Sequence, residues 1–351
     1  MNKVLLVSNM FPSSGNPTYG VFVKTIGSVL EQENEIDYVV IDKSTANVAY
    51  KLFLYTRFYL VMFLRLIFRK YDYIYIHFIS HSALPIIVLT WFGLKFKVIC
   101  HVHGGDVKNL PGRNRYFFKL KQKIVESILN KSVKIIAPSN SYASYISKRY
   151  DLSTSIVVYP SGGVDLDVFV NDPNIEKRSH VIGYAGRLEK SKNVDLIIKA
   201  MQEFPDIELE LVGGGSQLRY LEKLISELSL EESVTIKKPM NRQSLSEWFS
   251  SIECLIYPSS SESLGLVPLE AAACGCNLVL SDIPAFKEFH TQGLNFYMMS
   301  ELSVESLIVA LRKYFDTPEG KKVLFSHSNL DFISKHYSTT KTKKVLFDAF
   351  E

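Results

Sequence analysis

The sequence predicts two α/β domains in series, each a doubly wound parallel sheet with helices on both faces. Short β-rich runs alternate with helical stretches along the whole chain of 351 residues, as they do in successive βαβ units. A polar stretch at 164–180 contains Pro173, has no clear period and interrupts this alternation once. The length also exceeds what one hydrophobic core usually fills. We therefore expect a cleft between two sheets, with ligands held at the carboxyl ends of the strands.

The individual elements follow from composition and period. Six runs rich in β-branched and aromatic residues predict the strands of the first sheet, at 3–8, 36–41, 73–78, 96–100, 133–138 and 155–160. Five more predict the second, at 181–186, 207–213, 233–238, 253–258 and 277–281. Helical periodicity is clear at 115–131. We place the first domain at 1–170, the second at 179–335, and a last helix at 336–351 that could cross back to the first domain.

The charge is distributed unevenly between the two halves. Residues 1–170 carry 20 Lys and Arg against 11 Asp and Glu, whereas the remainder carries 20 against 25. A basic half can indicate an anionic partner such as lipid or nucleic acid, and an ordinary solvated surface explains it equally well. The four cysteines have neither C-x-x-C spacing nor neighbouring histidines, so they predict no zinc site and fit a reducing cytoplasm.

The longest apolar stretch, 52–68, predicts an amphipathic helix. It is nearly long enough to span a bilayer, but Arg57 and Arg65 lie inside it and are costly at the membrane centre. Their separation of about two helical turns puts them near one face. Such a helix can lie on a membrane or pack on a sheet, and packing is the simpler expectation.

The strongest local pattern is a Ser-rich loop between a strand and a helix, SSSESLGLVPLEAAACG at 259–275. Such a loop presents free backbone N–H groups and the positive end of the helix dipole, which suit a phosphate. Glu262 lies in the loop, and Glu270 lies in the helix beside small residues, where a buried carboxylate needs a partner. Residue chemistry leaves two interpretations open. In one, Glu262 caps the helix and Glu270 is a solvated helical residue; in the other, the two glutamates bind a ligand.

These residues resemble the glutamate pair of the retaining glycosyltransferases of family four, which have the GT-B fold. The resemblance implies that Glu270 holds the ribose hydroxyls of a nucleotide and that Glu262 contacts the transferred sugar. It also implies contacts to sugar and phosphate from three backbone amides, those of Gly265, Leu266 and Val267. The chain has Leu264 where the family often has Phe.

A second motif at 183–200, GYAGRLEKSKNVDLIIKA, carries Arg187 and Lys192 at a strand-to-helix turn. Two such cations can clamp a diphosphate, although basic residues at a turn are usually solvated. The same family has G-R-x-x-x-x-K-G here, which implies that both cations bind the donor diphosphate; Asn193 replaces the usual Gly. The glycine run at 213–215 lacks the dinucleotide spacing, and we assign it no chemistry.

Two loops of the first half complete the resemblance. The loop at 9–30 contains Gly20, which the resemblance places near the donor phosphates and the acceptor. HVHGGDVKN at 101–109 is similar to the family's H-G-x-D loop and implies that His103 lies beside the donor sugar, with His101 a distant second choice. His can stabilise a leaving phosphate or a sugar hydroxyl, with Asp106 orienting it, although a lone His is more often structural. Matching motifs occur in order from about residue 3 to about 300.

The mechanism expected is retaining sugar transfer without a metal and without a resident cofactor. No acidic pair has Mg²⁺-like spacing, so Arg187, Lys192 and the helix start near Gly265 would neutralise the leaving diphosphate. No residue is a convincing sugar nucleophile, so we expect attack on the same face, assisted by the leaving phosphate. Retention is implied by the resemblance alone.

The expected acceptor is a glycan or lipid-linked oligosaccharide in cell-surface polysaccharide synthesis (O-antigen, capsule or exopolysaccharide). A basic cluster could dock on anionic lipid: Lys108, Arg113, Arg115, Lys119, Lys121 and Lys123, with Tyr116, Phe117 and Phe118 among them. We expect a cytoplasmic protein that could sit peripherally on the inner face of the cell membrane.

Other functions stay open at this point. A non-catalytic nucleotide-sugar-binding subunit would show binding without turnover. Another GT-B enzyme, such as a nucleotide-sugar epimerase or a phosphorylase, would share the fold, but the complete set of two cations and two glutamates disfavours the epimerase. We expect no nucleic acid partner, because aromatic stacking motifs on strands are lacking.

Overall fold

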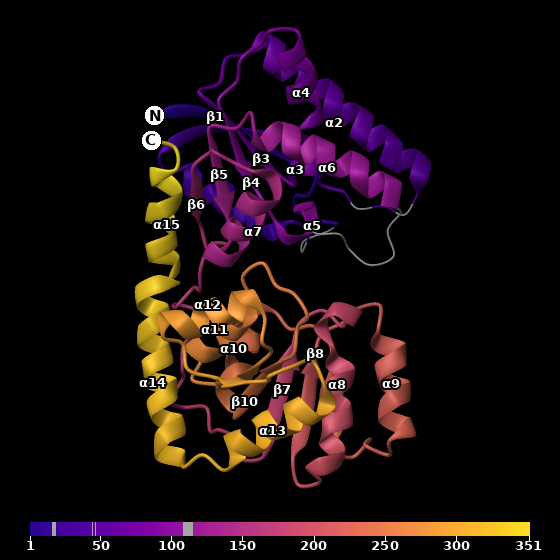
Figure 1. Ribbon diagram of the computed structural model, residues 1–351, viewed down its shortest axis with the longest axis vertical. Helices are drawn as coiled ribbons and strands as arrows, with labels where there is room; N and C mark the ends of the chain where they lie inside the picture. The colour runs from indigo at the N-terminus through magenta and orange to yellow at the C-terminus, as the bar shows by residue number, and fades with distance from the viewer. Residues whose placement is uncertain (16–18, 44, 46, 108–114) are drawn as a thin grey trace. The chain divides into compact units, whose positions relative to one another are not determined.

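A computed structural model describes residues 1–15, 19–43, 45, 47–107 and 115–351 and divides the chain into two compact units (Figure 1). One unit comprises Met1–Gly162 with Thr342–Glu351, and the other comprises Gly163–Lys341. Residues 163–170, which the sequence places in the first domain, group with the second unit. Each unit is described by itself.

The described part of the first unit is built on a parallel sheet in the order β2-β1-β3-β4-β5-β6. Its strands are β1 Asn2–Ser8, β2 Asn34–Val40, β3 Tyr73–His77, β4 Val98–His101, β5 Lys134–Ala137 and β6 Ile156–Val158. Its helices are α1 Val21–Leu30, α2 Val48–Phe68, α3 Ile79–Ser82, α4 Leu84–Trp91, α5 Gly104–Val107, α6 Arg115–Leu129, α7 Asn140–Tyr150 and most of α15 Thr339–Asp348. Every strand predicted for this half is present within a few residues.

Both faces of this sheet are buried, as the continuous apolar strands predict. In β1, Val4 and Leu6 join the core beneath α1 and the end of α15, whereas Leu5 and Val7 join the core beneath α2, α4, α6 and α7. The chain end is also tied to the sheet by hydrogen bonds, because Asn2 Nδ2 donates to the carbonyl of Phe350 at 3.2 Å.

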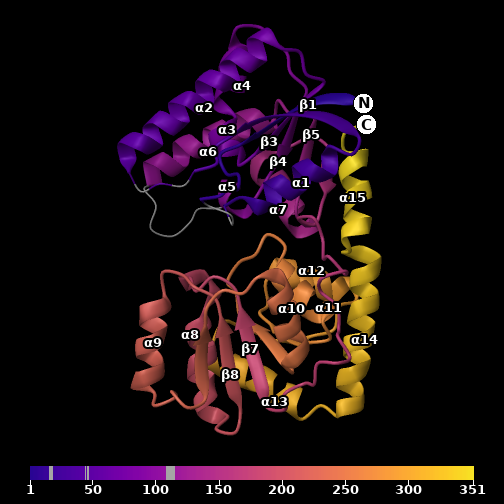
Figure 2. The same ribbon diagram turned by 180° about the vertical axis from the view of Figure 1, so that it is seen from behind.

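The second unit repeats the design with a parallel sheet in the order β12-β11-β10-β7-β8-β9. Its strands are β7 Val181–Ala185, β8 Glu208–Val212, β9 Val234–Lys237, β10 Cys254–Tyr257, β11 Asn277–Leu280 and β12 Tyr297–Met298. Its helices are η1 Lys190–Lys192, α8 Val194–Ala200, η2 Met201–Glu203, α9 Leu218–Glu227, α10 Arg242–Ser251, α11 Leu266–Ala273, α12 Pro284–Gln292, α13 Val304–Phe315 and α14 Glu319–His336. α8 contacts α9 and α13, and α11 contacts α10 and α14 (Figures 1 and 2). The predicted fold, doubly wound sheets in two units, is confirmed; only the two-residue β12 was not predicted.

The long apolar stretch forms α2, and no helix in the described residues is long and apolar enough to cross a membrane. One face of α2 packs into the core through Leu54, Phe58, Met62 and Leu66. Arg65 forms an ion pair with Asp37 at 2.6 Å. Packing on the sheet, the simpler of the two expectations, is therefore confirmed for that face.

Candidate functional site

The strand order of the second unit reverses between β7 and β10, with β8 and β9 on one side and β11 and β12 on the other. Ligands of open α/β sheets bind outside the carboxyl ends of the strands at such a point. The loops that leave these two strands, 186–193 and 258–265, therefore form the candidate site. Four predicted site residues lie in them: Arg187, Lys192, Glu262 and Gly265.

Hydrogen bonds hold the two loops against each other. The backbone N–H and the side-chain hydroxyl of Ser260 both donate to the carbonyl of Ser191, at 2.9 and 3.0 Å. Asn193 Nδ2 donates to the carbonyl of Pro258 at 2.8 Å. Asn193 has a φ of 50°, the left-handed conformation that Gly adopts most easily. The replacement of the family's Gly by Asn therefore preserves the turn and adds a bond across it.

Lys192 and Glu262 form an ion pair between the two loops. The Lys192 side chain is buried, with its ammonium 5.3 Å from the centre of the Tyr257 ring and 3.5 Å from its hydroxyl. A buried ammonium needs a counter-charge, and Glu262 supplies it. Arg187, by contrast, is exposed and has no ion pair among the described residues.

Tyr257 is a residue of this site that the sequence did not predict. Its ring stacks on Tyr184 at 5.5 Å and 15°. Burial raises the pKa of Tyr257 well above its usual value, and the carboxylates of Glu262 and Glu270 raise it further. The phenol therefore stays neutral among the charged groups. Its only signal in the sequence is an aromatic residue at the last position of a strand.

Gly265 directly precedes α11 as its N-cap, with a left-handed φ of 97° and no side-chain hydrogen bond to the helix. Leu266 and Val267 are the first two residues of α11, so their backbone N–H groups lie at the helix start. The predicted contact of these groups with sugar and phosphate stays a prediction. A Cβ on Gly265 would lie 2.5 Å from Cε1 of Phe286, which is fully buried and packs edge-on against Tyr257 at 6.2 Å. The site thus requires glycine here.

A Gly265→Ala variant should lose about 2–4 kcal/mol of unfolding free energy. Part of the loss arises because alanine is strained at a left-handed φ, and part arises because the added Cβ displaces Phe286. Urea unfolding measures it, with Gly320→Ala as the matched control. Gly320 lies in the first turn of α14 with nothing within 4 Å of an added Cβ, so its replacement should be neutral or slightly stabilising. Equal stability of the two variants would contradict the packing described here.

Glu270 lies one turn into α11, half-buried beside the buried residues Ala271–Ala273. Its carboxylate has no hydrogen bond or ion pair with any described residue. Burial raises its pKa to about 7, and nearby Arg242 only partly opposes this effect. Burying a carboxylate without hydrogen-bond donors costs free energy, and a bound ligand that supplies such donors would offset that cost.

The glycine run at 213–215 packs backbone against backbone. Gly213 has a φ of 156°, and a Cβ there would lie 1.9 Å from the carbonyl oxygen of Gly186. The N–H of Leu188 donates to Gly214 at 2.9 Å. The run therefore supports the loop that carries Arg187.

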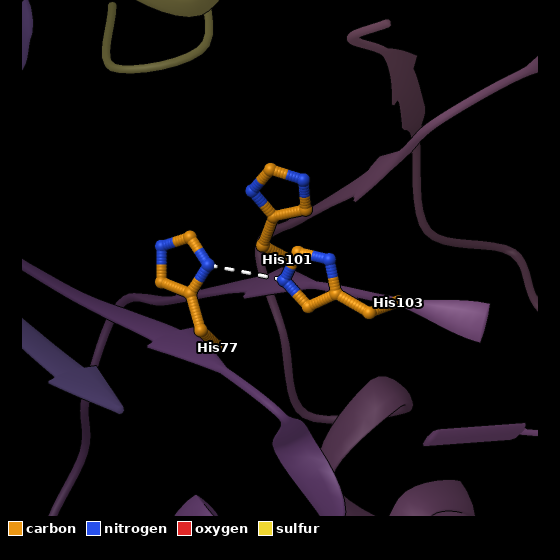
Figure 3. A group of neighbouring side chains, drawn as sticks. All are labelled: His77, His101 and His103. Carbon is orange, nitrogen blue, oxygen red and sulfur yellow. Dashed lines mark hydrogen bonds between the residues drawn. The ribbon is translucent and has the colours of Figure 1, made fainter. Parts of the chain in front are cut away.

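In the first unit, His103 follows β4 and forms a cluster with His77 and His101 (Figure 3). The rings of His77 and His103 meet edge to edge through a hydrogen bond of 3.1 Å, and the His101 ring stacks on His103 at 4.6 Å. Burial lowers the pKa of His103 to about 3 and those of the other two well below their usual value. His103 is therefore neutral at pH 7, which suits a contact to a sugar hydroxyl better than the neutralisation of a phosphate.

The three rings each offer a ligand atom within 4.8 Å of the others. Zinc at about 2.0–2.1 Å from each nitrogen requires the three lone pairs to converge on one point. Three of the ring nitrogens already have partners within the protein, because His77 Nδ1 and His103 Nε2 share a hydrogen bond and His101 Nδ1 is 2.6 Å from the hydroxyl of Tyr75. We interpret the cluster as a hydrogen-bonded stack that fixes the His103 ring, and His77 is a second residue that the sequence did not predict.

Gly20 is the N-cap residue before α1 and has a φ of 73°, and a Cβ on it would lie 2.6 Å from the backbone of Met10. This close approach, together with the left-handed backbone, explains on structural grounds alone why residue 20 is glycine. The predicted contact with donor phosphates stays a prediction.

The basic cluster predicted to meet anionic lipid is only partly described. Lys108 and Arg113 lie outside the described residues, and the side chains of 106 and 115–118 are not described either. Lys119 and Lys123 are exposed, but Lys121 is buried and donates to the carbonyl of Gly105 at 2.6 Å. The prediction was wrong for Lys121, because its ammonium binds the backbone that follows β4.

Comparison with known proteins decides the family. Residues 167–324 match the model of the glycosyl transferases group 1, and residues 19–168 match that of glycosyltransferase family 4. The chain belongs to glycosyltransferase family 4. Solved structures agree with its GT-B fold. A sucrose-phosphate synthase from Thermosynechococcus elongatus has a TM-score of 0.81 at 16% identity, over 100% of this chain and 98% of that one.

A second structure, that of Anabaena HepE in complex with UDP and glucose, has a TM-score of 0.72 at 16% identity and covers 99% of both chains. Among curated proteins, the family-4 chain is 28% identical over 173 residues to the D-inositol 3-phosphate glycosyltransferase of Pseudarthrobacter chlorophenolicus. That match covers 44% of this chain and 41% of the relative, so the chain spans less than half of that relative's length. The enzyme of the same name from Paenarthrobacter aurescens is 27% identical, over 61% of this chain and 57% of that protein.

Proposed function

We propose that this family-4 chain is a retaining, metal-independent hexosyltransferase that moves a sugar from a nucleotide-sugar donor to a glycan or lipid-linked acceptor. The observation that carries the proposal is the group of residues at the strand reversal of the second unit. There the buried Lys192–Glu262 pair joins the two loops, and Arg187 is exposed in the same loop as Lys192. Glu270 lies one turn into the helix that follows Glu262 and has no hydrogen bond or ion pair with any described residue.

Each residue has a chemical part in the proposed reaction. The negative charge of the leaving diphosphate is offset by Arg187, Lys192 and the N-terminus of α11. These groups take the part that a metal ion takes in metal-dependent enzymes. The carboxylate of Glu270 accepts hydrogen bonds from the ribose hydroxyls, and that of Glu262 contacts the hydroxyls of the sugar. His103 of the first unit is proposed as a neutral partner of the donor sugar. The leaving phosphate then assists attack by the acceptor on the same face.

We propose a UDP-sugar as the donor class to test first, because a structural neighbour of the chain is described in complex with UDP and glucose. We also propose that the acceptor belongs to cell-surface polysaccharide synthesis, at the inner face of the cell membrane. The excess of basic residues in the first half supports an acceptor bound to an anionic surface.

Thermal shift against a panel of nucleotide-sugars tests the proposal, followed by sugar transfer with the donor that binds. Arg187→Ala should weaken donor binding about tenfold to a hundredfold, because a charge-assisted contact to phosphate contributes about 1.5–3 kcal/mol. Arg219→Ala, an exposed arginine on α9, is the matched control. Undiminished transfer by the Arg187 variant would overturn the assignment, and donor binding without any turnover would identify a non-catalytic binder instead.

A further inference from the structure

The outer face of α2 and α4 exposes an unusual amount of apolar surface. Within the described residues, 11 of the 22 strongly exposed large apolar side chains lie between 48 and 92. On α2 they form a stripe at helical spacing, opposite to the face packed in the core: Phe53, Leu60, Leu64, Ile67 and Phe68. Trp91 and Phe92 at the end of α4 are 75% and 78% exposed. An exposed apolar stripe of this kind marks an interaction site.

The charge of this region is one-sided. From residue 43 to residue 105 the sequence contains eight Lys and Arg, and Asp72 is the only acid. Two copies of such a face would bring like charges together, so self-association is disfavoured. A partner that is both anionic and apolar would complement the positive charge and bury the exposed apolar side chains.

A cavity of about 650 Å³ opens where the end of α2 meets the segment that enters β4. Its charged lining consists of five cations and one acid: Lys3, Arg69, Lys70, Lys95, Lys97 and Asp72. Leu94 and Phe96 are among its apolar lining residues. Lys70 and Lys95 have no ion pair with any described residue, whereas Arg69 pairs with Asp37 at 3.0 Å. The cavity lies at the amino-terminal ends of β3 and β4, at the opposite edge of the sheet from His103.

We propose that the α2–α4 face docks on an anionic lipid bilayer, with Trp91, Phe92 and the apolar stripe of α2 entering the headgroup region and the cavity binding a lipid phosphate. The docking surface differs from the basic cluster at 108–123. The inference rests on the proposed function only for its purpose, which is to hold the enzyme where a lipid-linked acceptor lies. Its test needs no sugar transfer.

Vesicle co-sedimentation with the whole chain tests the docking. Wild type should bind vesicles containing phosphatidylglycerol and should bind pure phosphatidylcholine at least tenfold more weakly, and added salt should release it. The intrinsic fluorescence gives a second readout, because Trp91 is exposed and Trp248, the other tryptophan, is buried. Emission should shift to the blue with anionic vesicles, and Trp91→Phe should abolish the shift without abolishing binding.

Two double variants locate the surface. Trp91→Ser with Phe92→Ser, and Lys70→Gln with Lys95→Gln, should each lower partition into anionic vesicles about tenfold or more. Their controls are Val309→Ser with Leu324→Ser, at similarly exposed apolar positions of the second unit, and Lys148→Gln with Lys344→Gln. Controls and variants should show the same donor-induced thermal shift.

Three results would overturn the docking proposal. They are wild-type protein that stays in the supernatant with anionic vesicles, variants that bind as wild type does, and a stable dimer that the Trp91 and Phe92 changes dissociate. Failure of the proposed function is distinguishable, because vesicle binding would then persist in a protein that takes no nucleotide-sugar.

Discussion

Replacing Lys192 with Met should weaken binding of the nucleotide-sugar by about a hundredfold, or roughly 3 kcal/mol. The variant loses the buried cation proposed to meet the diphosphate, and it also leaves the Glu262 carboxylate facing that diphosphate without its lysine. Isothermal titration measures the loss. Lys190→Met is a closely matched control, since Lys190 lies in the same turn, is exposed and has no ion pair among the described residues. Equal affinity of the two variants would contradict the role of Lys192.

Glu262→Gln separates binding from transfer. The change frees the Lys192 ammonium from its carboxylate, so UDP itself should bind at least as tightly as it does to wild type. Transfer should nevertheless fall by about two orders of magnitude, because the proposed contact between Glu262 and the sugar is lost. In the double variant, removal of Glu262 should restore part of the UDP affinity that Lys192→Met loses. Additive effects of the two changes would show that the pair does not act as a unit.

The fold was predictable because both sheets are buried on two faces. The runs at 4–7 and 254–257 are apolar at every position, and only a central parallel strand requires that. β12 was not predicted because a strand of two residues is too short to show a hydrophobic pattern in the sequence. Residues 163–170 group with the second unit although the stretch at 164–180 is polar, because Val164 and Phe169 are buried in the second core.

The residues that meet in the candidate site were predictable where they carry charge at a turn, as Arg187, Lys192 and Glu262 do. Tyr257 and His77 were not predictable in this way, since an aromatic ring at a strand end is most often core and becomes part of a site only through its neighbours. Lys121 shows the opposite error. Its sequence neighbours suggest a basic surface, but its ammonium is buried against the carbonyl of Gly105. Local sequence cannot show which backbone group a long side chain reaches.

The pKa of about 7 at Glu270 predicts a pH dependence whose sign can be worked out. Between about pH 4.5 and 7 the folded protein holds a proton on this group that the unfolded chain releases, so stability without ligand falls as pH rises through that window. Glu270→Gln should therefore be more stable than wild type at pH 8, by at most about 3 kcal/mol, and equally stable near pH 4.5. Urea unfolding at the two pH values measures the difference.

Donor binding should show the opposite dependence on pH. Ribose hydroxyls donate to an ionised carboxylate, so the affinity of wild type should rise roughly tenfold between pH 6 and pH 8 as Glu270 ionises. The probe should be an intact nucleotide-sugar, because the terminal phosphate of UDP titrates near pH 6 itself. Glu270→Gln keeps a carbonyl acceptor but cannot ionise, so its affinity should be lower at pH 8 and nearly constant across the range. A variant whose affinity still rises tenfold would assign the titration to another group and remove Glu270 from the ribose.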